Sequence, residues 1–308
     1  MNTQITNRIL MVRPCSFYFN VETSSNNYFQ KNDHGTPALI QAQALEEFDL
    51  LVEKLIKNGI IVTVAQDTPV PSTPDSIFPN NWFISEPEGN LFLCPMFAEN
   101  RREERKKFLG PLIDSIKDFN ISLLNYTLKE KENEFLEGTG AIVIDRVNKV
   151  AFGSHSPRCD KELFYSFCKA RGYEPIYFTS YQSVDGKRLP IYHTNVMMAI
   201  GVDFAVLCAD SIDDPAEREL VIDALLKCKK EIIYISQEQA AHFAGNVIQL
   251  KDSNENIYTV MSETAFNAFT PDQKNIIEKN SKIIYSNIPT IETYGGGSVR
   301  CMIAEIFE

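Results

Sequence analysis

The sequence predicts an α/β fold in which one unit, strand–strand–helix–strand, is repeated around a common axis. Three observations indicate this: hairpins of short apolar strands, amphipathic helices after them, and a regular spacing between hairpins. The predicted hairpins begin near residues 82, 141, 196, 247 and 301. A period of roughly fifty to sixty residues is typical of radial or stacked repeats. Five such units would bring the hairpin starts together at one central end.

The chain before the first hairpin supplies a strand, a helix and a second strand. An apolar strand is expected over 9–13, and residues at helical spacing predict a helix over 45–56 that ends at Asn58 and Gly59. A second strand follows over 60–65, and then a proline-punctuated loop over 69–79. The polar segment 17–30 contains Asn20, Asn26 and Asn27. We interpret these first as turn residues, with ligand contact as the alternative, and Asn20 is the one retained as a candidate substrate contact.

The repeated units follow in the same order along the chain. Hairpins are expected over 82–95, 141–153, 196–208 and 247–261. Helices are expected from about residue 99, with an interruption near Gly110 and Pro111, and then over 161–170, 214–230 and 271–279. Closing strands are expected over 175–179, 232–235 and 282–285. The last strand is predicted to start at Cys301, with the N-terminal strand as its hairpin partner.

Polar or reactive residues stand immediately before each hairpin. The five groups are Asn80-Asn81, Glu137-Gly138-Thr139, His193-Thr194-Asn195, Gly245-Asn246 and Arg300-Cys301. Each group taken alone is compatible with a turn. Because equivalent positions of a radial repeat lie at the same end of the fold, we expect these side chains to converge on one axial cavity.

Cys301, His193 and Glu137 are the residues of these groups that carry chemistry. Cys301 follows the glycine run 295–297 and stands next to Arg300, which is a setting that favours a reactive thiolate. The alternative is that Cys301 is a small core residue. Together the three residues supply a nucleophile, a proton carrier and a carboxylate, and such groups are defined by geometry rather than chain order.

Composition and charge exclude several classes of function. The 308 residues carry a formal net charge of −11, which argues against nucleic acid and anionic membranes as partners. The seven cysteines include no CxxC pair, so neither a disulfide framework nor a zinc site is expected. No cluster has metal-ligand spacing and no nucleotide-binding motif follows a strand, so we expect no metal and no cofactor. Without a signal peptide or an apolar membrane span, a cytoplasmic location is expected.

Three segments resemble the guanidino-group-modifying superfamily, the penteins: LEGTGAIVIDR, YHTN and GGGSVRCM. The resemblance runs from Arg13 to the C-terminus, and FPNNW together with TIETYGGGSVRCM is most similar to citrulline-utilisation hydrolases, or citrulline ureidases. It implies a five-bladed α/β propeller of ββαβ modules with pseudo-five-fold symmetry, as a single catalytic domain over 1–308. It also implies Cys301 as nucleophile, His193 as acid and base, and Glu137 as their carboxylate partner.

The same resemblance implies how the rest of a small-molecule substrate is bound. Arg158 and Arg101 hold the positions that bind a substrate α-carboxylate, although Arg102 cannot be separated from Arg101 by sequence. No further partner is implied, and a homo-oligomer stays open.

Departures from the deiminase pattern concern the charge of the substrate. Deiminases carry aspartates where this chain has Asn81 and Asn195, and EGTG replaces the usual EGGD. A guanidinium presents only donors and favours carboxylates, whereas an amide suits a neutral ureido group. We therefore expect hydrolysis of citrulline to ornithine, ammonia and CO₂ through a thiocarbamate on the cysteine.

Two other functions stay open from the sequence. An arginine deiminase or dimethylarginine hydrolase would need another carboxylate, such as Asp75 or Asp145, in place of the missing aspartates. A non-catalytic pentein binding module would lack the catalytic trio, which this chain contains.

Overall fold

The computed structural model describes residues 4–32, 35–87, 89–116 and 122–307. Within these ranges the chain forms a mixed α/β fold with five three-stranded sheets. In each sheet the middle strand pairs antiparallel with one neighbour and parallel with the other. The sheets, in strand order, are β17 (Ala304–Ile306), β1 (Arg8–Arg13) and β2 (Ile61–Gln66); β3 (Phe83–Glu86), β4 (Asn90–Leu93) and β5 (Ser122–Asn125); β6 (Ile142–Asp145), β7 (Val150–Ser154) and β8 (Glu174–Phe178); β11 (Met198–Ile200), β12 (Phe204–Leu207) and β13 (Glu231–Tyr234); and β14 (Ile248–Lys251), β15 (Ile257–Ser262) and β16 (Lys282–Ser286).

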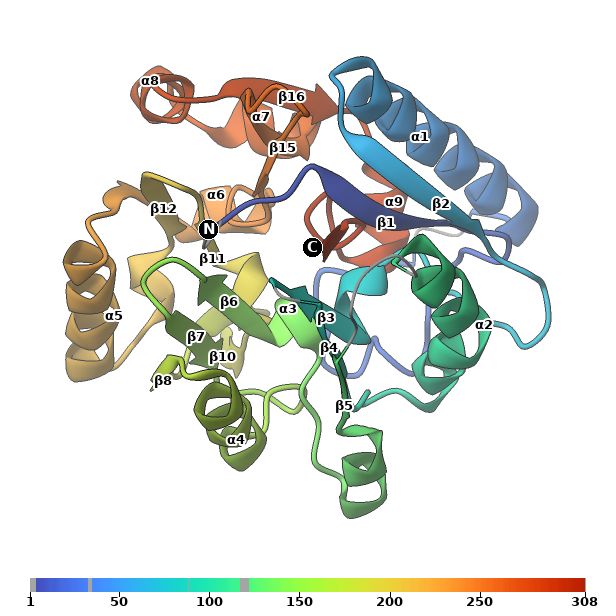
Figure 1. Ribbon diagram of the computed structural model, residues 1–308, viewed down its shortest axis with the longest axis horizontal. Helices are drawn as coiled ribbons and strands as arrows, with labels where there is room; N and C mark the ends of the chain where they lie inside the picture. Colours follow the sequence, from blue (N-terminus) through green and yellow to red (C-terminus); the bar gives the residue numbers. More distant parts are fainter. Residues whose placement is uncertain (1–3, 33–34, 88, 117–121, 308) are drawn as a thin grey trace.

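A helix connects the middle strand of each sheet to its parallel neighbour, as a parallel pair requires. These helices are α1 (Pro37–Lys57), α2 (Glu99–Ser115), α4 (Lys161–Arg171), α5 (Pro215–Lys227) and the pair α7 (Glu263–Ala268) and α8 (Pro271–Glu278). Figure 1 shows α1, α2, α4, α5 and α8 at the periphery, with the five sheets around a common centre. The sheets remain separate hydrogen-bonded units and do not join into one closed sheet within the described ranges.

The predicted repeat is confirmed at the level of strands and pairing. All four predicted hairpins form, and β17 pairs antiparallel with the N-terminal strand β1, so the two ends of the chain complete one sheet. The expected helix signals also act locally. Asp214 caps α5 through its side chain, and Gly172 ends α4 with a φ of 67°, a conformation that glycine adopts without steric cost.

Two predictions near proline and glycine are wrong. Helix α2 is not interrupted at Pro111, because Phe108 and Leu112 on either side of it are buried and hold the helix against the core. The glycine run does not lead straight into a strand: it ends a helix, α9 (Pro289–Gly295), with Gly296 at a φ of 61°. Strand β17 begins only at Ala304, so Cys301 lies in a turn before it.

Several short elements were not predicted because they lack a periodic apolar pattern. They are β5, whose residues are all exposed, the separate two-stranded sheet β9 (Tyr181–Val184) and β10 (Lys187–Pro190), and the helices α3 (Gly138–Ala141), α6 (Gln237–Ala241) and α7. Short 3₁₀ segments are η1 (Pro79–Asn81), η2 (Thr127–Glu132), η3 (Thr194–Val196) and η4 (Ala209–Ser211).

The core lies between the sheets and the peripheral helices. Helix α1, for example, buries Phe48, Leu51 and Leu55 against Ile9 and Met11 of β1. Burying such side chains contributes about 1.5–3 kcal/mol each, which fixes the helices around the central strands. No helix in the described part of the chain is long and apolar enough to cross a membrane.

Candidate active site

The short segments that precede the first strand of each hairpin meet around one cavity. The segments include η1, η3 and the turn before β17, each of which positions a polar side chain at the start of a sheet. The cavity is lined by Asn27, Asp75, Phe78, Asn81, Arg101, Arg158, Tyr192, His193, Gly295, Gly297 and Cys301. The expected convergence of these groups is therefore observed for Asn81, His193 and Cys301.

Two amides face the sulfur of Cys301. The amide nitrogens of Asn246 and Asn195 lie 3.3 and 3.7 Å from Sγ. The Asn246 oxygen accepts from the backbone N–H of Arg300 at 3.1 Å, so its NH₂ group must face the cysteine and the Asn195 carbonyl. Asn246 was not selected as a site residue from the sequence, although its place before the fourth hairpin was a usable signal. Cys301 is buried, and these two neutral amides make the hydrogen-bond contacts of its sulfur among the described residues.

His193, which lines the cavity, forms a buried pair with Glu137. His193 Nε2 lies 2.8 Å from a Glu137 oxygen that also receives Arg158 at 3.4 Å, and the other oxygen accepts from the Phe97 N–H at 2.9 Å. Burial opposes ionisation of Glu137, but Arg158 and His193 outweigh it and hold its pKa well below the usual range. Burial lowers the pKa of His193 to about 4 despite the neighbouring carboxylate.

These pKa shifts assign the tautomer of His193. An ionised Glu137 can only accept, so Nε2 must carry the proton and donate it to the carboxylate. Nδ1 then holds the lone pair, and at neutral pH the ring is an uncharged base. Gly140 lies directly beside it: a Cβ at this position would stand 2.7 Å from Nδ1 and would overlap the Asn81 amide nitrogen. Only glycine leaves room for both side chains.

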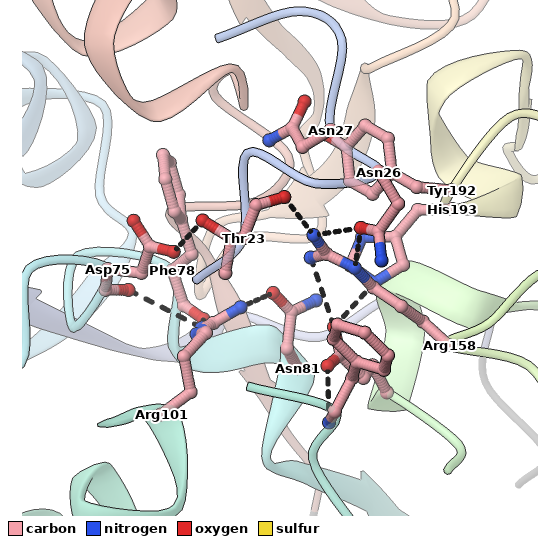
Figure 2. Close-up of polar contacts among 12 residues, drawn as sticks. Thr23, Asn26, Asn27, Asp75, Phe78, Asn81, Arg101, Arg158, Tyr192 and His193 are labelled. Carbon is pink, nitrogen blue, oxygen red and sulfur yellow. Dashed lines mark hydrogen bonds and ion pairs between the residues drawn. The ribbon is translucent and has the colours of Figure 1, made fainter. Parts of the chain in front are cut away.

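Asn81 lines the cavity and has an amide donor that no described residue uses. Its oxygen accepts from Arg101 Nη1 at 2.7 Å, as Figure 2 shows. Arg101 has only donors, so this bond fixes which end of the amide is oxygen. The Asn81 nitrogen is buried and has no hydrogen-bond partner in the described part of the protein. An unsatisfied buried donor is costly, so a ligand atom or a water molecule is expected to accept from it.

The two arginines are held by different partners. Arg101 makes a two-bond ion pair with Glu104 at 2.8 and 3.0 Å, and both side chains are buried. Arg158 donates from Nε and Nη2 to the Asn26 oxygen at 2.8 and 2.5 Å (Figure 2). Arg102, in contrast, does not line the cavity and donates to backbone carbonyls at Met96 and Phe97. The structure thus separates Arg101 from Arg102.

Asp75 is the carboxylate that lines the cavity. One oxygen accepts from Asn20 at 2.8 Å and from Thr23 at 3.0 Å, and the other, Oδ1, is buried without a hydrogen-bond partner among the described residues. Burial raises the pKa of Asp75. Asn20 lies behind Asp75 and does not itself line the cavity. Asp145 is remote from it and pairs with Lys230 at 3.2 Å.

The remaining lining residues were not selected from the sequence. Tyr192 donates to the Gly296 carbonyl at 2.7 Å, and Arg158 lies 4.8 Å from the centre of its ring. Within the described ranges no group of His, Cys, Asp and Glu has the arrangement of a metal site.

Comparison with known proteins identifies the family. The model of the eukaryotic N,N-dimethylarginine dimethylhydrolase family matches residues 13–308. No curated protein matches the sequence.

Solved structures share the fold at low identity. Full-length ArgZ, an arginine dihydrolase from the ornithine–ammonia cycle in cyanobacteria, is 17% identical with a TM-score of 0.73, over 98% of this chain and 40% of ArgZ. The isolated N-terminal domain of ArgZ, bound to substrate, is 17% identical with a TM-score of 0.71, over 98% of both chains. The dimethylarginine hydrolase (DDAH) of Pseudomonas aeruginosa, complexed with citrulline, is 14% identical with a TM-score of 0.64, over 98% of this chain and 99% of that one. This chain therefore spans less than half of full-length ArgZ.

The match of the family model over nearly the whole sequence, together with the shared fold, means that this chain belongs to the N,N-dimethylarginine dimethylhydrolase family of the guanidino-group-modifying pentein superfamily.

Proposed function

We propose that this protein hydrolyses the ureido group of citrulline to ornithine, ammonia and CO₂. The observation that carries the proposal is the buried amide nitrogen of Asn81. It has no hydrogen-bond partner among the described residues, and Arg101 fixes its orientation. A ureido group offers a carbonyl oxygen that accepts this hydrogen bond. A guanidinium offers five donors and no acceptor, so it would leave the Asn81 donor unsatisfied.

The surroundings of Cys301 support a neutral reacting group. Asn195 and Asn246 provide the polar contacts of its sulfur, and neither carries a charge. A cationic guanidinium would lose charge-assisted hydrogen bonds here, whereas a ureido group can both donate to and accept from amides. The citrulline complex of the Pseudomonas DDAH supports this type of ligand for the fold.

The reaction follows from the roles of three residues. Neutral His193 takes the thiol proton of Cys301, and the thiolate attacks the ureido carbon. The bond from that carbon to its terminal nitrogen breaks, and His193 gives the proton to this nitrogen, which departs as ammonia. A thiocarbamate remains on the sulfur of Cys301. His193 then activates water, the carbon–sulfur bond breaks, and the released carbamate loses CO₂ to give ornithine. Glu137 keeps His193 in the tautomer with a free Nδ1.

The amino-acid end of citrulline has complementary partners in the same cavity. The unpaired oxygen of Asp75 suits the α-ammonium group. Arg101 and Arg158 are the cations available for the α-carboxylate. Because the Asn26 oxygen occupies the Nε–Nη2 edge of Arg158, a carboxylate that uses this edge must displace Asn26.

We further propose that residues 1–308 form one catalytic domain, a five-bladed propeller of ββαβ modules. Five sheets with the same pairing around a common centre support this description. We also propose a cytoplasmic location, which the seven free cysteines support. The net charge of −11 argues against membrane and nucleic-acid partners.

Hydrolysis of arginine or dimethylarginine is the second candidate. The family match favours it, and so does Asp75, whose unpaired oxygen could pair with a guanidinium instead of an α-ammonium group. The two candidates differ in which end of the substrate meets Asp75.

Trapping of the covalent intermediate tests both the nucleophile and the substrate. The enzyme is mixed with citrulline, quenched in acid and analysed by peptide mass spectrometry, with Cys301→Ser as the control. We expect an adduct of citrulline minus ammonia on the peptide that contains Cys301, and none in the variant. An adduct formed from arginine or dimethylarginine but not from citrulline would contradict the proposal.

A further inference from the structure

A second cavity lies on the axis of the fold, lined by the first strands of the sheets and the N-terminal segment. Its volume is about 40 Å³, and strands β6, β11, β14 and β17 all contribute to its wall. Thr139 and Asn195, next to the candidate active site, line it as well. Three of its lining residues are charged: Arg146, Arg300 and Glu305.

Among the described residues that line this cavity, the charges do not balance. The Glu305 carboxylate forms ion pairs with Arg146 Nη1 at 3.3 Å and with Arg300 Nη2 at 2.7 Å, so one anion is paired with two cations. All three side chains are largely buried, with side-chain exposures of 5% for Arg146, 11% for Arg300 and 7% for Glu305. The lining therefore carries one net positive charge in a place where water screens it poorly. An uncompensated buried charge is strongly unfavourable.

Arg146 has an unused edge. Its Nε and Nη2 atoms are buried and have no hydrogen-bond partner in the described part of the protein. The guanidinium lies 4.3 Å from the centre of the Phe307 ring, and Nη1 is held by Glu305, so the plane is fixed from two sides. The free Nε–Nη2 edge thus presents two parallel N–H donors in a fixed geometry.

The same edge of other arginines in this protein binds a carboxylate. Arg13 uses Nε and Nη2 to bind the two oxygens of Asp49 at 2.8 and 2.7 Å. Arg101 uses them to bind Glu104 at 2.8 and 3.0 Å. Two oxygens on a planar carbon are the ligand that this fork geometry matches. Water can satisfy the two N–H groups of Arg146 but does not neutralise the charge.

We propose that the axial cavity binds one small planar oxyanion, such as bicarbonate or formate, on the Nε–Nη2 edge of Arg146. The anion accepts both N–H donors and neutralises the charge that Glu305 leaves uncompensated. Its site is distinct from the substrate cavity, since Arg146 does not line that cavity and Cys301 does not line this one. The proposal does not depend on which substrate the enzyme uses.

Calorimetric titration of the full chain tests the site. Potassium formate and potassium bicarbonate are titrated at constant ionic strength, with potassium chloride as the reference, into Cys301→Ser, which keeps the substrate cavity from reacting. We expect saturable binding of one anion per chain, weakened at least tenfold in Arg146→Gln. The matched control is Arg188→Gln, which removes an exposed arginine whose Nε and Nη2 both bind Asp213. It should bind as the parent does.

Two outcomes would overturn the proposal: no saturable binding, or binding that Arg146→Gln leaves unchanged. If Arg146→Gln does not fold, the test is a crystal structure of the unsubstituted protein from crystals grown in formate. Planar density on the free edge of Arg146 supports the site. Water alone at that edge, or formate only beside Arg158, contradicts it.

Discussion

Exchange of Asn81 for aspartate tests how the protein distinguishes a ureido group from a guanidinium. The variant Asn81→Asp keeps an oxygen for Arg101 Nη1, which the wild-type amide oxygen meets at 2.7 Å. It replaces the unpartnered amide nitrogen by a second oxygen that can only accept. The change therefore removes the donor on which the substrate assignment rests and adds one negative charge at the same position.

The size of the effect follows from that atom. In the variant, the ureido oxygen of citrulline faces an acceptor and is left buried without a donor, which costs about 1–3 kcal/mol. At about 1.36 kcal/mol per factor of ten, kcat/KM for citrulline should fall by roughly 5- to 150-fold. For arginine the sign reverses, because the new carboxylate accepts from the guanidinium.

The assay is kcat/KM for citrulline and for arginine in the wild type and in the variant, with thermal unfolding to confirm that the fold is retained. Asn125→Asp is the matched control, since it makes the same charge change at an exposed residue of β5. Citrulline kinetics equal to those of the wild type in Asn81→Asp would refute the reasoning. A loss of equal size in the control would assign the effect to net charge instead.

Three further predictions follow from the site. Gly140→Ala should lower kcat/KM by about 10²-fold, because the added Cβ displaces the His193 ring. The control is Gly110→Ala, where a Cβ meets nothing within 4 Å, and its kinetics should equal those of the wild type. Full activity of Gly140→Ala would contradict the geometry. Asp75→Asn should raise KM for citrulline by roughly 10- to 150-fold through loss of a charged hydrogen bond worth about 1.5–3 kcal/mol, with a smaller effect on kcat. An unchanged KM in steady-state assays would show that Asp75 does not bind the α-ammonium group. His193 takes up a proton near pH 6.5 in the unfolded state but only near pH 4 in the folded state. The free energy of unfolding should therefore decrease by up to about 3 kcal/mol as the pH falls from 6.5 to 4. Urea unfolding measured across this range should show the decrease, and His193→Gln should reduce it.

Much of the fold was predictable because its units repeat a local pattern. Short apolar runs joined by turns predicted the hairpins, and the predicted pairing of the N-terminal strand with the C-terminal one is observed between β1 and β17. The glycine run misled because its surroundings imitate a strand. The run of apolar residues from Met302 onward is typical of a strand, yet Met302 lies in the turn that carries Cys301 and β17 begins only at Ala304.

Some residues of the candidate site could be predicted from the repeat, and others could not. Asn81, His193 and Cys301 precede hairpins, so the repeat alone brought them together, and the cavity contains all three. Asp75 comes from a loop without periodicity and reaches the cavity only by tertiary folding, so no local pattern could place it. Asn20 was a candidate substrate contact, but its amide supports Asp75 from behind the cavity wall.

The most direct test of the central claim compares substrates side by side. Ammonia release is measured from citrulline, arginine and dimethylarginine at equal concentrations, with amino-acid products identified in each reaction. We expect ammonia and ornithine from citrulline and no turnover of the two guanidino compounds. Citrulline formed from arginine or dimethylarginine, with no ornithine formed from citrulline, would contradict the assignment of the unpaired Asn81 donor to a ureido oxygen.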